Sequence, residues 1–146
     1  MHGLIAATAD QTPSDWGIDW ATGLHIYQNV PGGTGTALGT GAPNTDKIIA
    51  QNGAGSAYAA GLARAYSGGG YSDWYLPSKD ELNELYLSRE AIGGFHTYRA
   101  DRPWYWSSSE GMDVSYYAWS QRFDSGQQIP NDSKYFTNRV RAVRSF

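Results

Sequence analysis

The chain of 146 residues contains no cysteine. It therefore has no disulfide framework, no thiolate metal site and no thiol nucleophile. Charge is also sparse, because charged residues make up 17% of the chain and the formal net charge is -3. No global positive field attracts nucleic acid. No apolar run reaches the length of a membrane span, and the first residues do not resemble a signal peptide, so we expect no membrane insertion.

Glycine and aromatic residues are abundant, with 18 glycines and 14% aromatic residues. Much of the backbone must therefore be irregular and held by large side chains that pack around tight turns. A chain of this length suits one domain, which buries about two thirds of the surface that its unfolded form exposes. We predict a single domain over residues 1–146 with its own core.

The first part of the chain alternates between a short strand and a long loop. Residues 3–7 form an apolar run that predicts a strand. Residues 10–43 are expected to be mostly loop, with a short strand at 24–27. Trp16 and Trp20 stand in this loop and offer a means of fixing it to the core.

Two helices are predicted in the middle of the chain. Asn44 or Thr45 can cap a helix that begins near Lys47, is interrupted by glycines at 53 and 55, and resumes over 56–66. A second helix is expected over 79–89.

The start of this second helix carries a capping box, in which Ser78 accepts a hydrogen bond from the amide three residues later and Glu81 accepts one from the Ser78 amide.

Residues 104–146 are predicted to form strands and loops. This order of elements predicts an α+β domain with segregated helices and strands.

The last third of the chain shows a two-residue alternation typical of a strand with two unlike faces. One face carries Trp119, Gln121 and Phe123, and the other carries Ser120, Arg122 and Asp124. We expect the first face to be buried and the second to be displayed. The predicted buried set is Trp74, Trp104, Trp106, Trp119, Phe123 and Val140.

Catalytic interpretations find little support in the sequence. Turn chemistry accounts for Asp73 and the capping box for Glu81, so neither needs to be a hydrolytic carboxylate. The serines at 107–109 lack a nucleophile elbow, and the candidate bases are His2, His25 and His96. We expect these serine hydroxyls to bond to backbone at a strand end, and we expect no enzyme activity.

Metal and anion sites are also weighed against simpler explanations. Asp124, Asn131 and Asp132 could lie near Glu110 and supply oxygen ligands of the kind that calcium prefers, but their spacing matches no calcium loop. Calcium stays a minority hypothesis, and we predict no metal and no cofactor. Three arginines at 139, 141 and 144 more often form ion pairs than bind phosphate in a mildly acidic protein.

Several motifs together resemble a family of bacterial and archaeal C-type-lectin-like domains. They are residues 71–82 (YSDWYLPSKDEL), 105–110 (YWSSSE), Ala118-Trp119 and 139–144 (RVRAVR). The resemblance implies two helices that flank a small antiparallel sheet, with a long irregular loop region. Members usually carry a further strand before the segment that matches His2, and this sequence does not show it. The cysteines and the calcium and sugar motifs of animal C-type lectins are missing, so those activities are not implied.

A narrower resemblance is to the variable proteins of diversity-generating retroelements, in which adenine-directed mutagenesis rewrites asparagine-like codons. Residues that such changes can produce fill about 111–138, and they are interrupted by Trp119, Gln121, Gln127, Gln128 and Lys134, which are not reachable. The simpler explanation is that any polar loop is rich in reachable residues. The predicted ligand-binding residues are Ser115, Tyr116, Tyr117, Ser120, Arg122, Asp124, Ser125, Ile129, Asn131, Asp132, Ser133, Tyr135, Phe136 and Asn138.

These observations predict a non-enzymatic domain that presents a diversifiable surface to a protein or cell-surface ligand, with aromatic contacts fixed on a rigid scaffold. The alternative is an adhesin that binds carbohydrate or glycosaminoglycan, with Arg139 or Arg141 contacting sulfate. A hydrolase ranks third. The family resemblance implies display at a cell or virion surface.

Overall fold

The computed structural model describes residues 3–112 and 115–146 and confirms an α+β fold. The strands are β1 (Leu4–Ala6), β2 (Ile18–Asp19), β3 (Trp104–Glu110), β4 (Tyr117–Arg122), β5 (Gln128–Ser133), β6 (Thr137–Asn138) and β7 (Val143–Ser145). The helices are α1 (Gly41–Asn52), α2 (Ala59–Ala65), α3 (Lys79–Leu87) and α4 (Arg89–Ile92), with 3-10 turns η1 (Gly23–Tyr27), η2 (Gly68–Gly70) and η3 (Arg99–Asp101).

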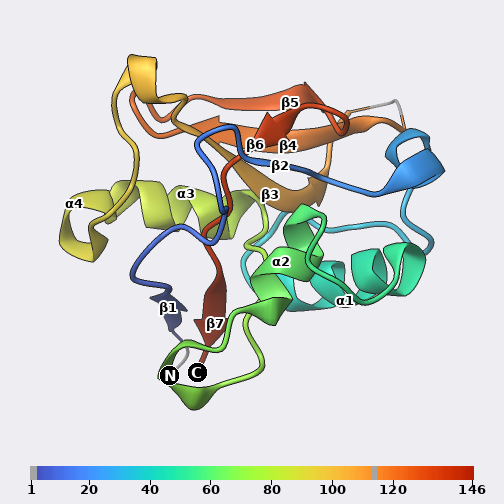
Figure 1. Cartoon of the computed structure of the whole chain (residues 1–146), viewed down its shortest axis with the longest axis horizontal. Helices are drawn as coiled ribbons and strands as arrows, with labels where there is room; N and C mark the ends of the chain where they lie inside the picture. The colour runs from blue at the N-terminus through green and yellow to red at the C-terminus, as the bar shows by residue number, and fades with distance from the viewer. Residues whose placement is uncertain (1–2, 113–114) are drawn as a thin grey trace.

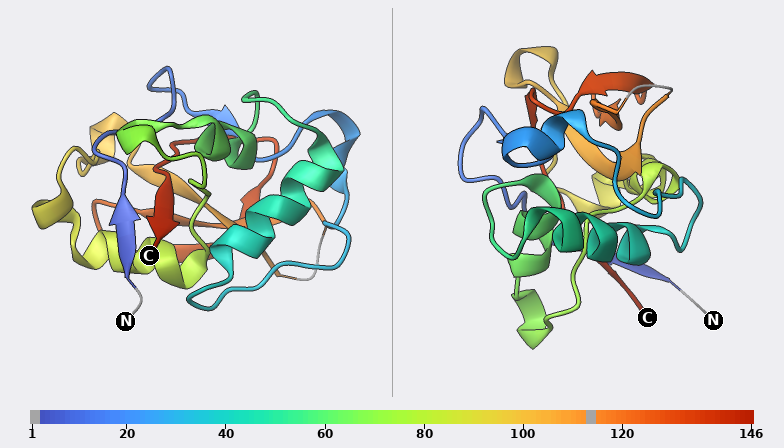
Figure 2. Two further views of the ribbon diagram at one scale, coloured as in Figure 1. Left: turned by 90° about the horizontal axis from the view of Figure 1, so that it is seen from below. Right: turned by 90° about the vertical axis from the view of Figure 1, so that its right-hand side faces the viewer.

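The strands form three small antiparallel sheets. β3, β4 and β5 lie side by side in that order, and β2 pairs with β6. β1 pairs with β7, with Leu4 opposite Ser145, so the two ends of the described chain lie next to each other (Figures 1 and 2). This pairing forms without the further strand that members of the resembling family usually carry before the segment matching His2.

The three-stranded sheet contacts α3 on one face and the β2–β6 ribbon on the other. On the α3 side, Gln121 Nε2 donates to Asn83 Oδ1 at 2.9 Å. On the other side, Trp106 Nε1 donates to the backbone oxygen of Ile18 at 2.7 Å. Both faces of this sheet are therefore covered over much of their area, which decides which strand residues remain exposed.

The first predicted helix is two helices, and it begins earlier than the sequence suggested. α1 starts at Gly41, so Asn44 and Thr45 lie within its first turns and do not cap it. Both side chains fix other segments instead. Asn44 Oδ1 accepts from the Gly35 amide at 2.8 Å, and Thr45 Oγ1 accepts from the Leu76 amide at 3.0 Å. The interruption predicted near residue 53 is confirmed by the break between α1 and α2.

α3 begins as its capping box predicts. Ser78 Oγ accepts from the Glu81 amide, and Glu81 Oε1 accepts from the Ser78 amide at 2.9 Å. The helix ends at Leu87, and α4 continues the path after a break at Ser88. The predicted end near residue 89 therefore marks a junction between two helices.

One tryptophan fixes the long N-terminal loop. Trp20 is 1% exposed, and its Nε1 donates to the Ser107 backbone oxygen at 2.7 Å. Trp16 is 72% exposed and does not join the core. The strand predicted at 24–27 is wrong, because η1 occupies this segment. The loop is thus anchored to β3 by Trp20.

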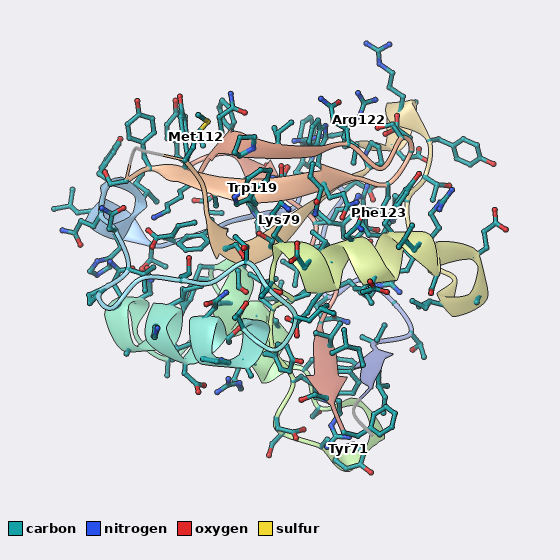
Figure 3. The ribbon with its side chains drawn as sticks, turned by 180° about the vertical axis from the view of Figure 1, so that it is seen from behind. Tyr71, Lys79, Met112, Trp119, Arg122 and Phe123 are labelled. Carbon is teal, nitrogen blue, oxygen red and sulfur yellow. The ribbon has the colours of Figure 1, made fainter. Side chains whose placement is uncertain are left out.

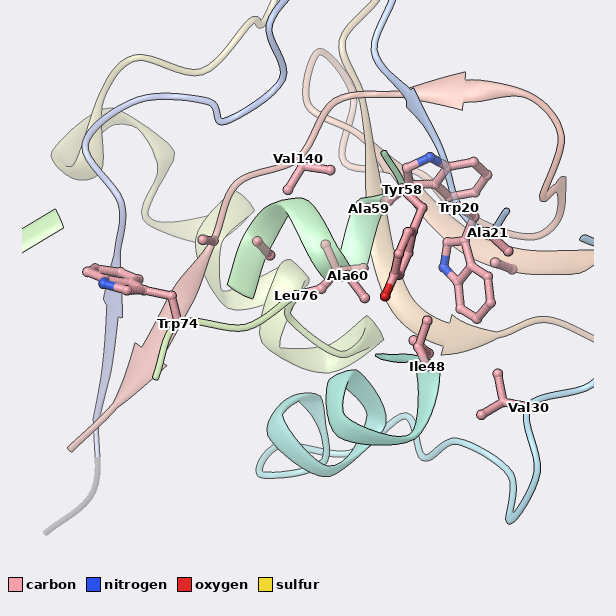
Figure 4. Packing of buried hydrophobic residues seen from close by; sticks show 14 of the residues in the cluster. Trp20, Ala21, Val30, Ile48, Tyr58, Ala59, Ala60, Trp74, Leu76 and Val140 are labelled. Carbon is pink, nitrogen blue, oxygen red and sulfur yellow. The ribbon is translucent and has the colours of Figure 1, made fainter. Parts of the chain in front are cut away.

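The main core forms where α1 and α2 meet β3 and the loop around Trp20 (Figure 4). Ile48, Tyr58 and Trp106 are among its buried members. Of the predicted buried set, Trp74, Trp106, Phe123 and Val140 are buried, whereas Trp104 and Trp119 are half-buried. A second cluster around Phe123 and Tyr105 fills the space between the sheet and α3.

Candidate functional site

Most of the predicted site lies on the hairpin of β4 and β5 and the turns at its ends. β4 and β5 pair antiparallel, with Tyr117 opposite Ser133 and Gln121 opposite Gln128. The tight turn between them needs Gly126, whose φ of +83° is unfavourable for other residues. A side chain there would also meet the ring of Tyr86. Figure 3 shows Met112 near one end of the hairpin and Arg122 near the other. Residues 113–114 of the predicted variable stretch lie outside the described residues.

Four predicted site residues are buried, so their assignment to a displayed surface is wrong: Ser120, Asp132, Ser133 and Asn138. Ser120 pairs across the strands with Trp106, on the face that β2 covers. The amide of Trp20 donates to the backbone oxygen of Lys134 at 3.2 Å, so the loop after β2 also covers the end of β5. The two faces alternate as predicted, but the second face also has a covering layer.

Three of these buried residues form a polar network. Asp132 Oδ2 accepts from Ser120 Oγ and from Asn138 Nδ2, both at 2.7 Å. Asp132 is 8% exposed, and burial raises the pKa of its carboxyl above the ordinary value, although both hydrogen bonds act in the opposite direction. The network ties β4, β5 and β6 together.

The raised pKa of Asp132 makes part of the stability depend on pH. The folded state favours the protonated carboxyl, so its contribution is fully present below the ordinary pKa of about 4 and is lost as the pH rises through the folded-state pKa. We expect Asp132→Asn to remove this component. Urea unfolding of both proteins from pH 4 to pH 7 measures it: the stability of the variant relative to the parent should rise with pH. A difference that stays constant would contradict the assignment.

An aromatic cluster occupies one end of the hairpin. The rings of Tyr116 and Tyr117 lie 4.8 Å apart, and those of Tyr135 and Phe136 lie 4.9 Å apart, both edge to face. Tyr116, Tyr135 and Phe136 are exposed, the last by 55%. The neighbouring Tyr116 hydroxyl raises the pKa of Tyr117. These four residues, called the aromatic cluster below, are the largest exposed apolar group of the predicted site.

One neighbour of this cluster has no signal in the sequence. Ser115 Oγ donates to the backbone oxygen of Tyr27 at 2.6 Å, which brings η1 to the start of β4. Leu24 and Tyr27 of η1 are both exposed. Their position beside the site follows from tertiary structure alone, because about ninety residues of sequence separate them from β4.

The other end of the hairpin is polar. Arg122 Nε donates to Asp124 Oδ1 at 2.9 Å, and a second bond joins Nη2 to Oδ2. This fork lowers the pKa of Asp124. Both side chains are half-buried, and Ser125 beside them is exposed. Between the two ends, Ile129 is half-buried and Asn131 exposed on β5, the edge strand of the sheet.

The residues that interrupt the reachable stretch mostly have structural contacts. Gln128 Nε2 donates to the Lys79 backbone oxygen at 2.8 Å, and Gln121 bonds to Asn83. The Lys79 ammonium lies 4.9 Å from the centre of the Trp119 ring. These contacts attach the hairpin to the start of α3. Gln127 is the exception, since it is exposed.

Lys134 is 0% exposed and holds three segments together. Its Nζ donates to Glu110 Oε2 at 3.0 Å and to the Gln28 backbone oxygen at 2.9 Å, and it lies 4.5 Å from the centre of the Trp20 ring. Burial lowers the pKa of Lys134, and the Glu110 carboxylate opposes this. A charged residue in the middle of the predicted variable stretch is therefore part of the scaffold.

Two of the C-terminal arginines form buried ion pairs, as the composition indicated. Arg141 Nε donates to Asp10 Oδ1 at 2.9 Å, and Arg139 Nη1 lies 3.9 Å from Asp10 Oδ2. Both arginines are buried, so the suggestion that either contacts a sulfate group is wrong. Arg144 pairs with Asp73 at the surface.

The carboxylates considered as calcium ligands each bond to a different side chain. Glu110 pairs with Lys134, Asp124 with Arg122, and Asp132 with Ser120 and Asn138. Within residues 3–112 and 115–146, no group of three or more histidine or carboxylate side chains is arranged to hold a metal ion.

Two of the three serines in β3 donate to backbone as predicted, whereas Ser108 Oγ accepts from Asn44 Nδ2 at 3.2 Å. Ser107 Oγ donates to the Trp119 oxygen and Ser109 Oγ to the Gly35 oxygen, both at 2.7 Å. His96 Nδ1 lies 3.0 Å from Asp10 Oδ2, and His25 Nδ1 lies 2.8 Å from Gln28 Oε1. His2 lies outside the described residues. None of the helices in the described part is long and apolar enough to cross a membrane.

Comparison with known proteins agrees with this architecture. The model of the Lcl C-terminal domain family matches residues 9–144, which is nearly the whole chain. No curated protein sequence matches the chain. The match confirms the C-type-lectin-like resemblance that the motifs indicated. The chain therefore belongs to the Lcl C-terminal domain family and is a lectin-like domain of the ligand-binding type.

Proposed function

We propose that the chain is a non-enzymatic binding domain that presents the exposed side of the β4–β5 hairpin to a protein on a cell surface. The aromatic cluster carries this proposal. Tyrosine and phenylalanine supply large contact areas at a low cost in side-chain entropy, and they dominate the binding energy of many interfaces. Its four rings lie at one end of a hairpin whose strands are fixed on both faces.

The contacting residues in this proposal are those that the fold leaves accessible. They are Ser115, Tyr116, Tyr117, Arg122, Asp124, Ser125, Ile129, Asn131, Tyr135 and Phe136. Because Gln121, Gln128 and Lys134 attach the hairpin to the core, the accessible residues can change without altering the backbone that carries them. This separation is what a diversified binding surface requires.

We further propose that a diversity-generating retroelement alters these accessible positions. In support of this, the unreachable Gln121, Gln128 and Lys134 attach the hairpin to the core, whereas most of the reachable predicted residues are accessible. The buried Ser120, Asp132, Ser133 and Asn138 and the exposed Gln127 depart from this pattern. Sequencing the gene's locus tests it: we expect a reverse transcriptase gene and a near-copy of the 3′ coding region, differing mainly at adenines in the codons of accessible residues. A locus without both features would rule out diversification, and the binding proposal would then need another origin.

The glycan-binding alternative keeps one supporting observation, because exposed aromatic faces can also stack on sugars. A glycan array with and without chelator separates the two. We expect weak signals that do not respond to the chelator. Strong, salt-sensitive binding to particular glycans would favour the adhesin over the protein-binding domain.

A further inference from the structure

A pocket of about 410 Å³ lies at the polar end of the hairpin, and of its lining only Arg122 belongs to the predicted site. We call it the arginine pocket. Its lining residues are Arg99, Arg102, Pro103, Trp104 and Arg122. Trp104 and Arg122 face each other across β3 and β4, and the Arg122 guanidinium lies 5.5 Å from the centre of the Trp104 ring. One wall of the pocket is thus a rigid sheet.

The opposite wall is a turn with a strained backbone. Arg102 follows η3 with a φ of +55°, and it is the one non-glycine among residues 3–112 and 115–146 in the left-handed region. Such a conformation persists where the surroundings enforce it, often at a binding site. Here Arg139 enforces it from beneath: Nη2 donates to the Asp101 oxygen at 2.6 Å and Nε to the Arg102 oxygen at 3.1 Å. The turn is therefore held in place before any ligand binds.

The pocket carries positive charge that the described structure does not neutralise. Asp124 compensates Arg122, but Arg99 and Arg102 form no ion pair within the described residues. The Arg102 guanidinium instead lies 4.7 Å from the centre of the exposed Trp16 ring. Asp15 is exposed nearby and pairs with Arg139 at 3.5 Å. On a chain with a net charge of -3, this local excess suits a single anionic group better than a polyanion.

We propose that the arginine pocket binds the carboxylate of an aspartate or glutamate side chain on a protein partner. Guanidinium groups bind carboxylates through paired hydrogen bonds, and Trp104, which lines the pocket, offers its ring to an adjoining apolar or aromatic residue. The pocket extends the contact surface beyond residues 111–138. The assignment of a carboxylate ligand rests on the proposed function in one respect, namely that the partner is a protein.

A peptide titration tests the pocket without the natural partner. The probe is N-acetyl-Glu-Phe-amide, its control is N-acetyl-Gln-Phe-amide, and the readout is the NMR signal of each tryptophan indole N–H. We expect the acidic peptide to shift the Trp16 and Trp104 signals and to bind about tenfold more tightly than the amide control, as expected for one charge-assisted contact. Equal binding of the two peptides would overturn the proposal.

Variants locate the effect in the arginine pocket. Arg99→Gln and Arg102→Asn should each weaken binding of the acidic peptide about tenfold; asparagine is chosen at 102 because it tolerates a left-handed backbone. Asp124→Asn should strengthen it, since Arg122 is then free. Arg144→Gln, at a surface arginine outside the pocket lining, should leave it unchanged. Because the readout is peptide binding, this result stands even if diversification fails. A sulfated disaccharide that binds more tightly than the acidic peptide would contradict a carboxylate site.

Discussion

Replacing Arg141 by methionine is expected to lower the free energy of unfolding by about 3–5 kcal/mol, because it leaves a buried carboxylate without its main partner. Arg141 is fully buried, and its Nη2 lies 2.8 Å from Asp10 Oδ1. Its Nη1 also donates to the backbone oxygens of Ala7 and Gly93, both at 3.0 Å. The substitution therefore disconnects the N-terminal segment from the junction after α4. Urea unfolding monitored by tryptophan fluorescence measures the change.

The matched control is three residues away. Arg144 also pairs with an aspartate, Asp73, through Nε and Nη2, but this pair lies at the surface. Exposed ion pairs contribute little, so Arg144→Met should leave the unfolding midpoint nearly unchanged. In addition, Asp10→Asn should recover part of the loss in the Arg141→Met background. Equal effects of the two arginine substitutions would contradict the assignment of Arg141 to the scaffold.

The second large effect is expected at Lys134. Lys134→Met removes the partner of Glu110 and the hydrogen bond to Gln28, and it leaves the Glu110 carboxylate, with 14% side-chain exposure, without a cation. We expect a loss of about 3–5 kcal/mol, as for other broken buried pairs. The Val30 amide still donates to Glu110 at 3.0 Å, which keeps the segment from separating completely.

A double replacement shows whether the unpaired charge or the lost packing causes the loss of stability in Lys134→Met. Adding Glu110→Gln to Lys134→Met removes the unpaired charge and should restore about half of the lost free energy. A neighbouring exposed residue serves as the control, because Tyr135→Ser changes a position outside both core clusters and should shift stability by less than about 1 kcal/mol. If Lys134→Met behaved like Tyr135→Ser, residue 134 would belong to the displayed surface.

The sequence predicted local features well where the signal was local. The capping box at Ser78 fixed the start of α3, and the break near Gly53 was visible from glycine alone. The order of elements was enough for the α+β class. Asn44 and Thr45 were misread as caps because their partners, Gly35 and Leu76, lie in other segments.

The candidate site shows the same limit. Periodicity separated the two faces of β4, with Trp119 and Gln121 on one and Ser120 and Arg122 on the other. It could not show that β2 and β6 cover the second face at Ser120 while leaving Arg122 partly accessible. That difference depends on a ribbon formed by residues 18–19 and 137–138, more than a hundred positions apart. Long-range pairing of this kind leaves no mark in a single sequence.

The central claim is that accessible residues of the hairpin can change while the scaffold stays folded. The most direct test is thermal unfolding of a variant that carries alanine at every exposed position of the predicted site. These positions are Tyr116, Ser125, Asn131, Tyr135 and Phe136. We predict a midpoint within about 4 °C of the parent protein, since surface substitutions have small individual effects. A fall of more than about 10 °C would show that these residues hold the fold together and would contradict the division between scaffold and displayed surface.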